Sequence, residues 1–70
     1  MNNNIMIKYS FLYKKAEQLY INGNFEYALQ LFRQIDDADT NFDVQNYIGC
    51  CLLNLGQYWK AKEIFEAISI

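Results

Sequence analysis

Two stretches of sequence decide the fold: residues 22–35 read NGNFEYALQLFRQI, and residues 55–68 read LGQYWKAKEIFEAI. Shifting the chain on itself by 33 residues superposes them. The shift pairs five identical residues, namely Leu19 with Leu52, Gly23 with Gly56, Ala28 with Ala61, Phe32 with Phe65, and Ile35 with Ile68. Three further pairs match in kind, namely Ala16 with Gly49, Phe25 with Tyr58, and Leu31 with Ile64. A fixed period of this length predicts a chain built from two similar halves.

The residues before Gly23 follow the period of a helix. Apolar or small side chains recur at spacings of four, three, four and three, at Ile5, Tyr9, Leu12, Ala16 and Leu19. They form one face of a 3.6-residue repeat, which predicts a first helix over about residues 5–22. Gly23 then predicts a helix end, because glycine readily adopts the left-handed conformation that terminates helices.

A second helix should follow Gly23 directly. Asn24 can serve as its N-cap. We expect the helix to end at Asp36 and Asp37, because carboxylates at a helix C-terminus oppose the helix dipole. Its apolar face is predicted to comprise Phe25, Ala28, Phe32 and Ile35.

The second half predicts two more helices around Gly56. Asn41 or Asp43 can cap the first of them. Its apolar face is Val44, Ile48, Cys51, Leu52 and Leu55, and that of the last helix is Tyr58, Ala61, Phe65 and Ile68. No segment alternates with period two, so we expect an all-α fold of four helices joined by short turns.

Composition restricts the function. The 70 residues suffice for one domain, residues 1–70, and carry a net charge of -2 without any run of basic residues. Nucleic acids and anionic membranes bind clustered cations, so neither is an expected partner. No stretch approaches the roughly 20 consecutive apolar residues of a membrane span. The absence of histidine removes histidine-based catalysis and Cys/His zinc sites. We expect no enzymatic activity, no cofactor and no metal.

The matched positions resemble the tetratricopeptide repeat (TPR) family, twice over, across nearly all of residues 9–69. In both halves a small residue and a large apolar residue precede the glycine, an aromatic residue follows it, and an alanine, an aromatic and an apolar residue complete the pattern. These positions are Ala16, Leu19, Gly23, Phe25, Ala28, Phe32 and Ile35, and then Gly49, Leu52, Gly56, Tyr58, Ala61, Phe65 and Ile68. The chain departs from the family at Leu12 and Gln45, where the family often has Trp.

The resemblance implies two helix-turn-helix repeats, about residues 9–41 and 42–70, with four antiparallel helices in a short right-handed solenoid. It also implies a concave groove, lined by the first helix of each repeat, that binds a peptide or a helix. The residues expected to line this groove are Tyr13, Glu17, Tyr20, Asn46, Tyr47, Cys50 and Leu53. The carboxylate clamp of some family members is not expected, because only Lys14 lies near the required cationic positions.

The exposed edge of the last helix is a second candidate interface. We expect Ile64, Phe65 and Ile68 to face a further repeat or a second copy of the chain, and Trp59 to be an exposed contact residue. Two functions stay open at this point. One is an adaptor, scaffold part or small chaperone that binds a protein partner in the groove. The other is a self-assembling structural protein that pairs through its repeat edges.

Two other patterns are interpreted as structural. Asp37, Asp39, Asn41 and Asp43 have the spacing of calcium-loop ligands, but Phe42 and Ile48 stand where that loop needs Gly and Glu. We interpret the segment as a solvated loop with helix-capping residues. Cys50 and Cys51 are adjacent, so a disulfide between them would be strained, and we expect reduced thiols in a cytoplasmic protein.

Overall fold

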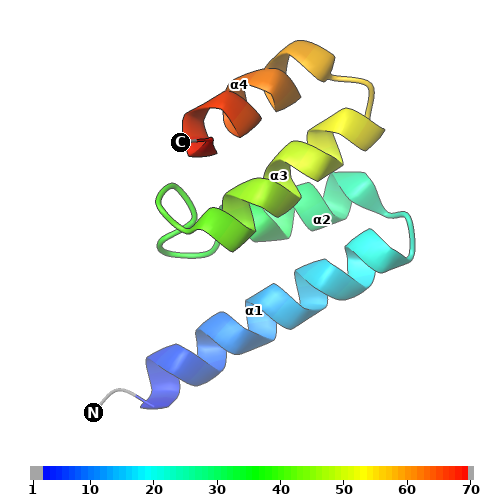
Figure 1. Ribbon diagram of the computed structural model, residues 1–70. Coiled ribbons are helices and arrows are strands. Elements are labelled where there is room, and N and C mark those ends of the chain that lie inside the picture. The colour runs from blue at the N-terminus through cyan, green and yellow to red at the C-terminus, as the bar shows by residue number, and fades with distance from the viewer. Residues whose placement is uncertain (1–2, 70) are drawn as a thin grey trace.

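The described part of the chain, residues 3–69, folds into four α-helices (Figure 1). The computed structural model describes the backbone of residues 3–69 and the side chains of residues 11–69. The helices are α1 (Asn3–Ile21), α2 (Phe25–Arg33), α3 (Phe42–Asn54) and α4 (Tyr58–Ile68). The described residues contain no strand, so the prediction of an all-α fold with four helices is confirmed. The predicted side-chain contacts of Ile5 and Tyr9 lie outside the described residues.

The helices pack in the order of the sequence. The extensive contacts of the described chain join α1 with α2, α2 with α3, and α3 with α4. Figure 1 shows α1 and α4 on opposite sides of the α2 and α3 pair. The molecule is flat, with extents of 39 × 29 × 14 Å. The core face of each helix is thus covered by the helices that precede or follow it in the sequence.

The two glycine turns are built alike. Gly23 and Gly56 have φ angles of 82° and 81°, which strain any residue with a β-carbon. The Gly23 N–H donates to the Tyr20 carbonyl at 3.0 Å, and the Asn24 N–H donates to the Leu19 carbonyl at 2.8 Å. Gly56 and Gln57 repeat this pattern with the carbonyls of Leu53 and Leu52, at 3.0 Å and 2.9 Å. Both turns are Schellman motifs, so the predicted helix ends are confirmed.

Some boundaries and caps differ from the predictions. Helix α2 ends at Arg33 rather than at the aspartates, because residues 34–40 continue as turns. Asn24 stands at the N-cap of α2, but its side chain makes no capping hydrogen bond. Asn41 does cap α3, since its Oδ1 accepts the Val44 N–H at 3.1 Å. Asp43 instead lies in the first turn of α3, where a carboxylate complements the helix dipole.

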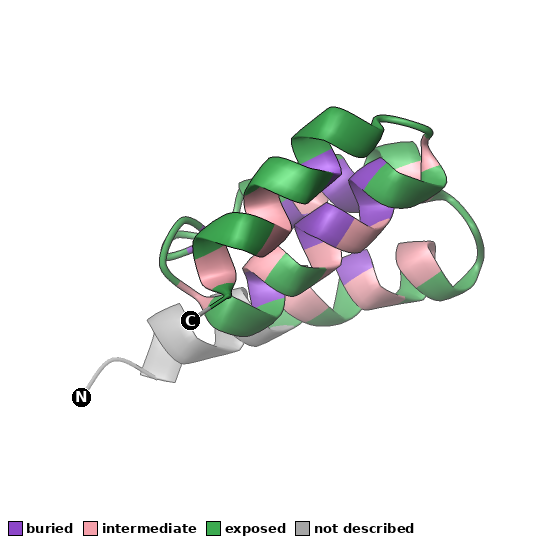
Figure 2. Ribbon diagram, turned by 45° about the horizontal axis from the view of Figure 1, so that its top comes forward, coloured by how far each residue is buried: buried purple, intermediate pink, exposed green. Residues whose placement is uncertain are grey.

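The core forms a single cluster at the centre of the flat molecule (Figure 2). The small residues of the repeat pattern are all buried there, as their tight positions between helices require. Ala38, in the turns after α2, is also buried, although no helical pattern marked it. The core consists of Ala16, Ala28, Leu29, Phe32, Ile35, Ala38, Val44, Ile48, Cys51, Leu52 and Ala61.

The aromatic residues after the two glycines behave differently. Phe25 is half-buried, and its ring meets that of Tyr20 edge-on at a centroid distance of 5.3 Å. Tyr58 occupies the matching position but is 66% exposed. The interpretation of Tyr58 as a member of the core face of α4 is therefore wrong. A tyrosine can occupy this position in water because its hydroxyl remains hydrated.

Candidate functional site

Three tyrosines connect α1 with α3. The rings of Tyr13 and Tyr20, on α1, meet the ring of Tyr47, on α3, edge-on at centroid distances of 5.9 Å and 5.2 Å. We call these three residues, together with Glu17, the tyrosine cluster. Edge-to-face pairs of this kind contribute about 0.5–1.5 kcal/mol beyond the area that they bury. The cluster therefore holds together two helices that do not follow each other in the sequence.

A short hydrogen bond supplies the polar part of the cluster. The Tyr47 hydroxyl donates to Glu17 Oε2 at 2.7 Å, across a sequence separation of 30 residues. A hydrogen bond to a carboxylate stabilises the protonated phenol, and burial acts in the same direction. Together they raise the pKa of Tyr47 well above its ordinary value near 10. Tyr47 is thus a fixed donor at neutral pH.

The cluster is attached to the core on one side and to Cys50 on another. The ring of Tyr47 stacks on buried Phe32, with a centroid distance of 4.6 Å and an interplanar angle of 12°. Burial, followed by the neighbouring Cys50, raises the pKa of Tyr20. The Asn54 side chain acts on that pKa in the opposite direction, and its Nδ2 donates to the Cys50 carbonyl at 2.8 Å.

Most of the residues predicted for the groove lie together. Tyr13, Glu17, Tyr20, Tyr47 and Cys50 are all half-buried. Asn46 and Leu53, on α3, are exposed. Sequence reasoning missed Phe32 and Asn54 as neighbours of the cluster. Asn54 could have been found, because it lies one helical turn after Cys50. Phe32 could not, because its stack on Tyr47 depends on how α2 packs against α3.

The predicted edge residues of α4 divide into two groups. Ile64 and Phe65 pack against the core cluster and are half-buried. Ile68 is also half-buried. Trp59 is 78% exposed, and Lys62 Nζ lies 5.2 Å from its ring centroid. Part of the predicted apolar edge therefore contributes to the core of the chain itself.

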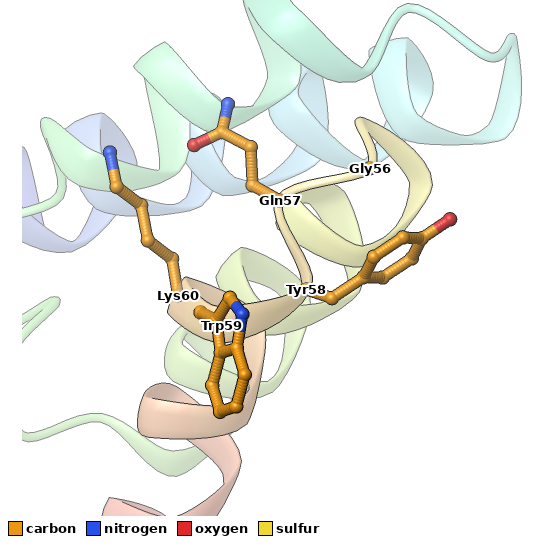
Figure 3. Close-up of a pocket in the computed structure, with 5 residues that line it drawn as sticks. All are labelled: Gly56, Gln57, Tyr58, Trp59 and Lys60. Atoms are coloured by element: carbon orange, nitrogen blue, oxygen red, sulfur yellow. The ribbon is translucent and has the colours of Figure 1, made fainter.

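Trp59 also lines a shallow hollow at the start of α4 (Figure 3). The other lining residues are Gly56, Gln57, Tyr58 and Lys60. In Figure 3 the rings of Tyr58 and Trp59 point in different directions. They therefore do not enclose a ligand between them, and the hollow comes from a single turn of chain.

Further polar groups lie in the segment after α2 and around the two cysteines. Among the described residues, no group of Cys, Asp or Glu side chains could hold a metal ion. In the acidic segment after α2, Asn41 caps α3, and its Nδ2 donates to Asp37 Oδ2 at 3.4 Å. Burial raises the pKa of Cys51 to about 11, so this thiol stays protonated at neutral pH. Both cysteines are free.

Comparison with known proteins found no relative of this chain. No family model matches the chain, and the searches of curated proteins and of solved structures returned no match. Among the described helices, none combines the length and the apolar character that crossing a bilayer requires.

Proposed function

We propose that the chain is a protein-interaction module, built as two TPR-like repeats in a short right-handed solenoid. Its binding face is formed by α1 and α3 around the tyrosine cluster, and its ligand is a peptide or a helix of a partner protein. The module acts as an adaptor, a scaffold part or a small chaperone. The free cysteines fit a reducing compartment, so we place it in the cytoplasm.

One observation carries this proposal. Tyr47 of the second half contacts Tyr13 and Tyr20 of the first half, so side chains of the first helices of the two halves meet. The sequential packing of the four helices supports the same arrangement, since repeat arrays bury their core between neighbours. Two adjacent first helices are the parts from which a repeat groove is made.

The chemistry of this face suits a mostly uncharged ligand. Tyrosines provide large, rigid contact areas at low cost in conformational entropy. Leu53, exposed on α3, adds an apolar contact, and Asn46 adds an amide that can donate and accept hydrogen bonds. Few charges belong to this set, so binding should vary little with salt.

The proposal can be tested by selecting peptides from a displayed library on the immobilised chain. Affinities of the selected peptides are then measured by calorimetry for the parent and for an Asn46→Ala, Leu53→Ala double variant. Both side chains are exposed, so their loss should leave the fold intact. We expect at least a tenfold loss of affinity, which corresponds to about 1.4 kcal/mol.

The matched control is Tyr27→Ala, which removes a large exposed side chain from α2 instead. It should bind like the parent. If the double variant binds as tightly as the Tyr27 control, the ligand does not occupy the face of α1 and α3, and the assignment of the groove fails.

Self-assembly through α4 is the competing function. The observation in its favour is the exposed Trp59, because tryptophan is the residue most enriched at interface hot spots. The outer face of α4 carries Trp59, Lys62 and Glu66. The two functions differ in what this face contacts, which is water in the first and another chain in the second.

A further inference from the structure

The outer face of α4 has a counterpart in α2, 33 residues earlier, and α3 packs against that counterpart. Phe32 of α2 stacks on Tyr47 of α3, and Leu29, one turn before it, is only 6% exposed. Arg33, one turn after Leu29, is close enough to the α3 residue Cys51 to affect its pKa. This face of α2 is therefore a stacking surface for the helix that follows.

On α4 the same positions carry a different chemistry. Lys62 stands where α2 has Leu29, and its side chain is 59% exposed. Its ammonium group pairs with Glu66 Oε2 at 3.8 Å and lies over the ring of Trp59. Lys62 thus covers part of an exposed aromatic ring and presents charge to the solvent.

Phe65 of α4 is directed toward α3, the other helix of the second half. A β-carbon on Gly49 of α3 would lie 2.7 Å from the Phe65 ring, so this ring occupies the space above the glycine. The first half has Ala16 at the position of Gly49. Because Gly49 has no side chain, Phe65 can pack close against α3. Less of its apolar surface is then available to a neighbouring chain.

We infer that the outer face of α4 is a capping surface: it covers the core of the second half and faces water, and copies of the chain do not stack on it. The inference rests on the proposed repeat arrangement.

The surface of α1 that head-to-tail stacking would place against α4 also argues against stacking. Ile48 and Cys51 are buried on α3, and their counterparts on α1 are the exposed Lys15 and Gln18. Stacking would bury lysines from both sides, and unpaired buried charges are costly.

The test is sedimentation equilibrium of the 70-residue chain from micromolar to millimolar concentration. The parent should remain monomeric. In Lys62→Leu the association constant for self-association should rise roughly 10- to 100-fold, which is the effect of burying one additional leucine side chain. Adding Lys15→Ile, which gives α1 the residue type of Ile48, should increase association further. The matched control is Lys60→Leu, which adds the same apolar group on α4 outside the stacking positions and should stay monomeric.

Two outcomes separate the cap from the repeat arrangement. Leu29→Lys should abolish cooperative unfolding, because it places the charge of Lys62 at the buried position of α2. A melt unchanged by Leu29→Lys would mean that α3 does not pack on this face of α2, so the repeat arrangement itself would fail. If Leu29→Lys unfolds the chain as expected, either of two results would overturn the capping surface and leave the repeat arrangement standing. One is self-association of the parent, and the other is equal self-association of Lys62→Leu and Lys60→Leu.

Discussion

The two halves of the molecule share one backbone plan and differ in how much of it they bury. The turns at Gly23 and Gly56 have the same φ angle within a degree and the same pair of hydrogen bonds. Yet Phe32 is fully buried, whereas its counterpart Phe65 is half-buried. The difference arises because, among the described residues, α2 packs extensively against both α1 and α3, whereas α4 does so against α3 alone. For these two phenylalanines, which are identical residues at matching positions, the surrounding helices decide how far the ring is buried.

The largest effect is expected from truncating these two phenylalanines. Phe32→Ala removes a fully buried ring that contacts Tyr13 and Tyr47, and it should cost about 3–5 kcal/mol in the free energy of unfolding. Phe65→Ala should cost clearly less, because water already reaches part of that ring. Denaturant titrations of both variants measure the difference. Equal losses would show that the halves are equally buried and would contradict the comparison.

Overpacking the two buried alanines should have the next largest effect. Ala28→Leu and Ala61→Leu each insert a branched side chain at a close helix contact and should cost about 1–3 kcal/mol. The loss should be greater for Ala28, since α2 is confined on both sides. Thermal melts measure both, with Gln30→Leu as a control on an exposed position of α2. If both leucine variants were as stable as the parent, the 33-residue alignment that pairs Ala28 with Ala61 would be wrong.

The glycine turns should respond equally to substitution. Gly23→Ala and Gly56→Ala each force a β-carbon into the left-handed region, at a cost of about 1–2 kcal/mol. A β-carbon at either position would meet no atom within 4 Å, so the backbone conformation alone sets this cost. Chemical denaturation should give the same value for both. A difference above experimental error would mean that the turns are not equivalent.

The hydrogen bond between the halves should have the smallest effect and a specific pH dependence. Tyr47→Phe removes the donor to Glu17 and should cost about 1 kcal/mol at pH 7. The pKa of Tyr47 is raised in the folded state, so its contribution is complete below pH 10 and is lost as the pH rises further. The parent should therefore lose its advantage over Tyr47→Phe only above pH 10.

A second titration in the same experiment serves as an internal reference. The pKa of Cys51 is raised to about 11 by burial, so both proteins should lose stability as the pH rises from 9 to 11. Unfolding free energies measured across this range separate the shared loss from the loss due to Tyr47. A parent and variant that differ equally at pH 8 and above pH 10 would show that Glu17 does not hold the Tyr47 proton.

The sequence predicted those features that depend on short-range physics. The helices follow from apolar periodicity, and the turns follow from Gly23 and Gly56, whose conformation few other residues adopt. Buried Ala28 and Ala61 follow from their place in the middle of each apolar face. Most of the residues predicted for the groove also lie together, because residues off the core face of α1 and of α3 meet where those helices meet.

The features that sequence reasoning missed depend on tertiary neighbours. Tyr58 fits an apolar pattern as well as Phe25 does, but Phe25 packs on the ring of Tyr20, whereas the matching position of α3 carries Leu53, which is itself exposed. Ala38 belongs to no periodic pattern, and its burial follows from the way the turns after α2 fold back, where Gln45 Nε2 donates to its carbonyl at 2.8 Å. The approach of Phe65 to Gly49 depends on the distance between two helices, which periodicity does not contain.

The packing of each helix on its sequence neighbours also has a consequence for folding kinetics. Contacts between elements that are close along the chain form with little loss of chain entropy, so proteins dominated by them fold in microseconds to milliseconds. In this chain α1 contacts α2 and α3 contacts α4, so we expect these two hairpins to form locally and to dock afterwards through α2 and α3. The bond between Tyr47 and Glu17 spans both hairpins and should form last. Temperature-jump fluorescence across a denaturant series would then find folding rates almost unchanged in Tyr47→Phe and unfolding rates increased.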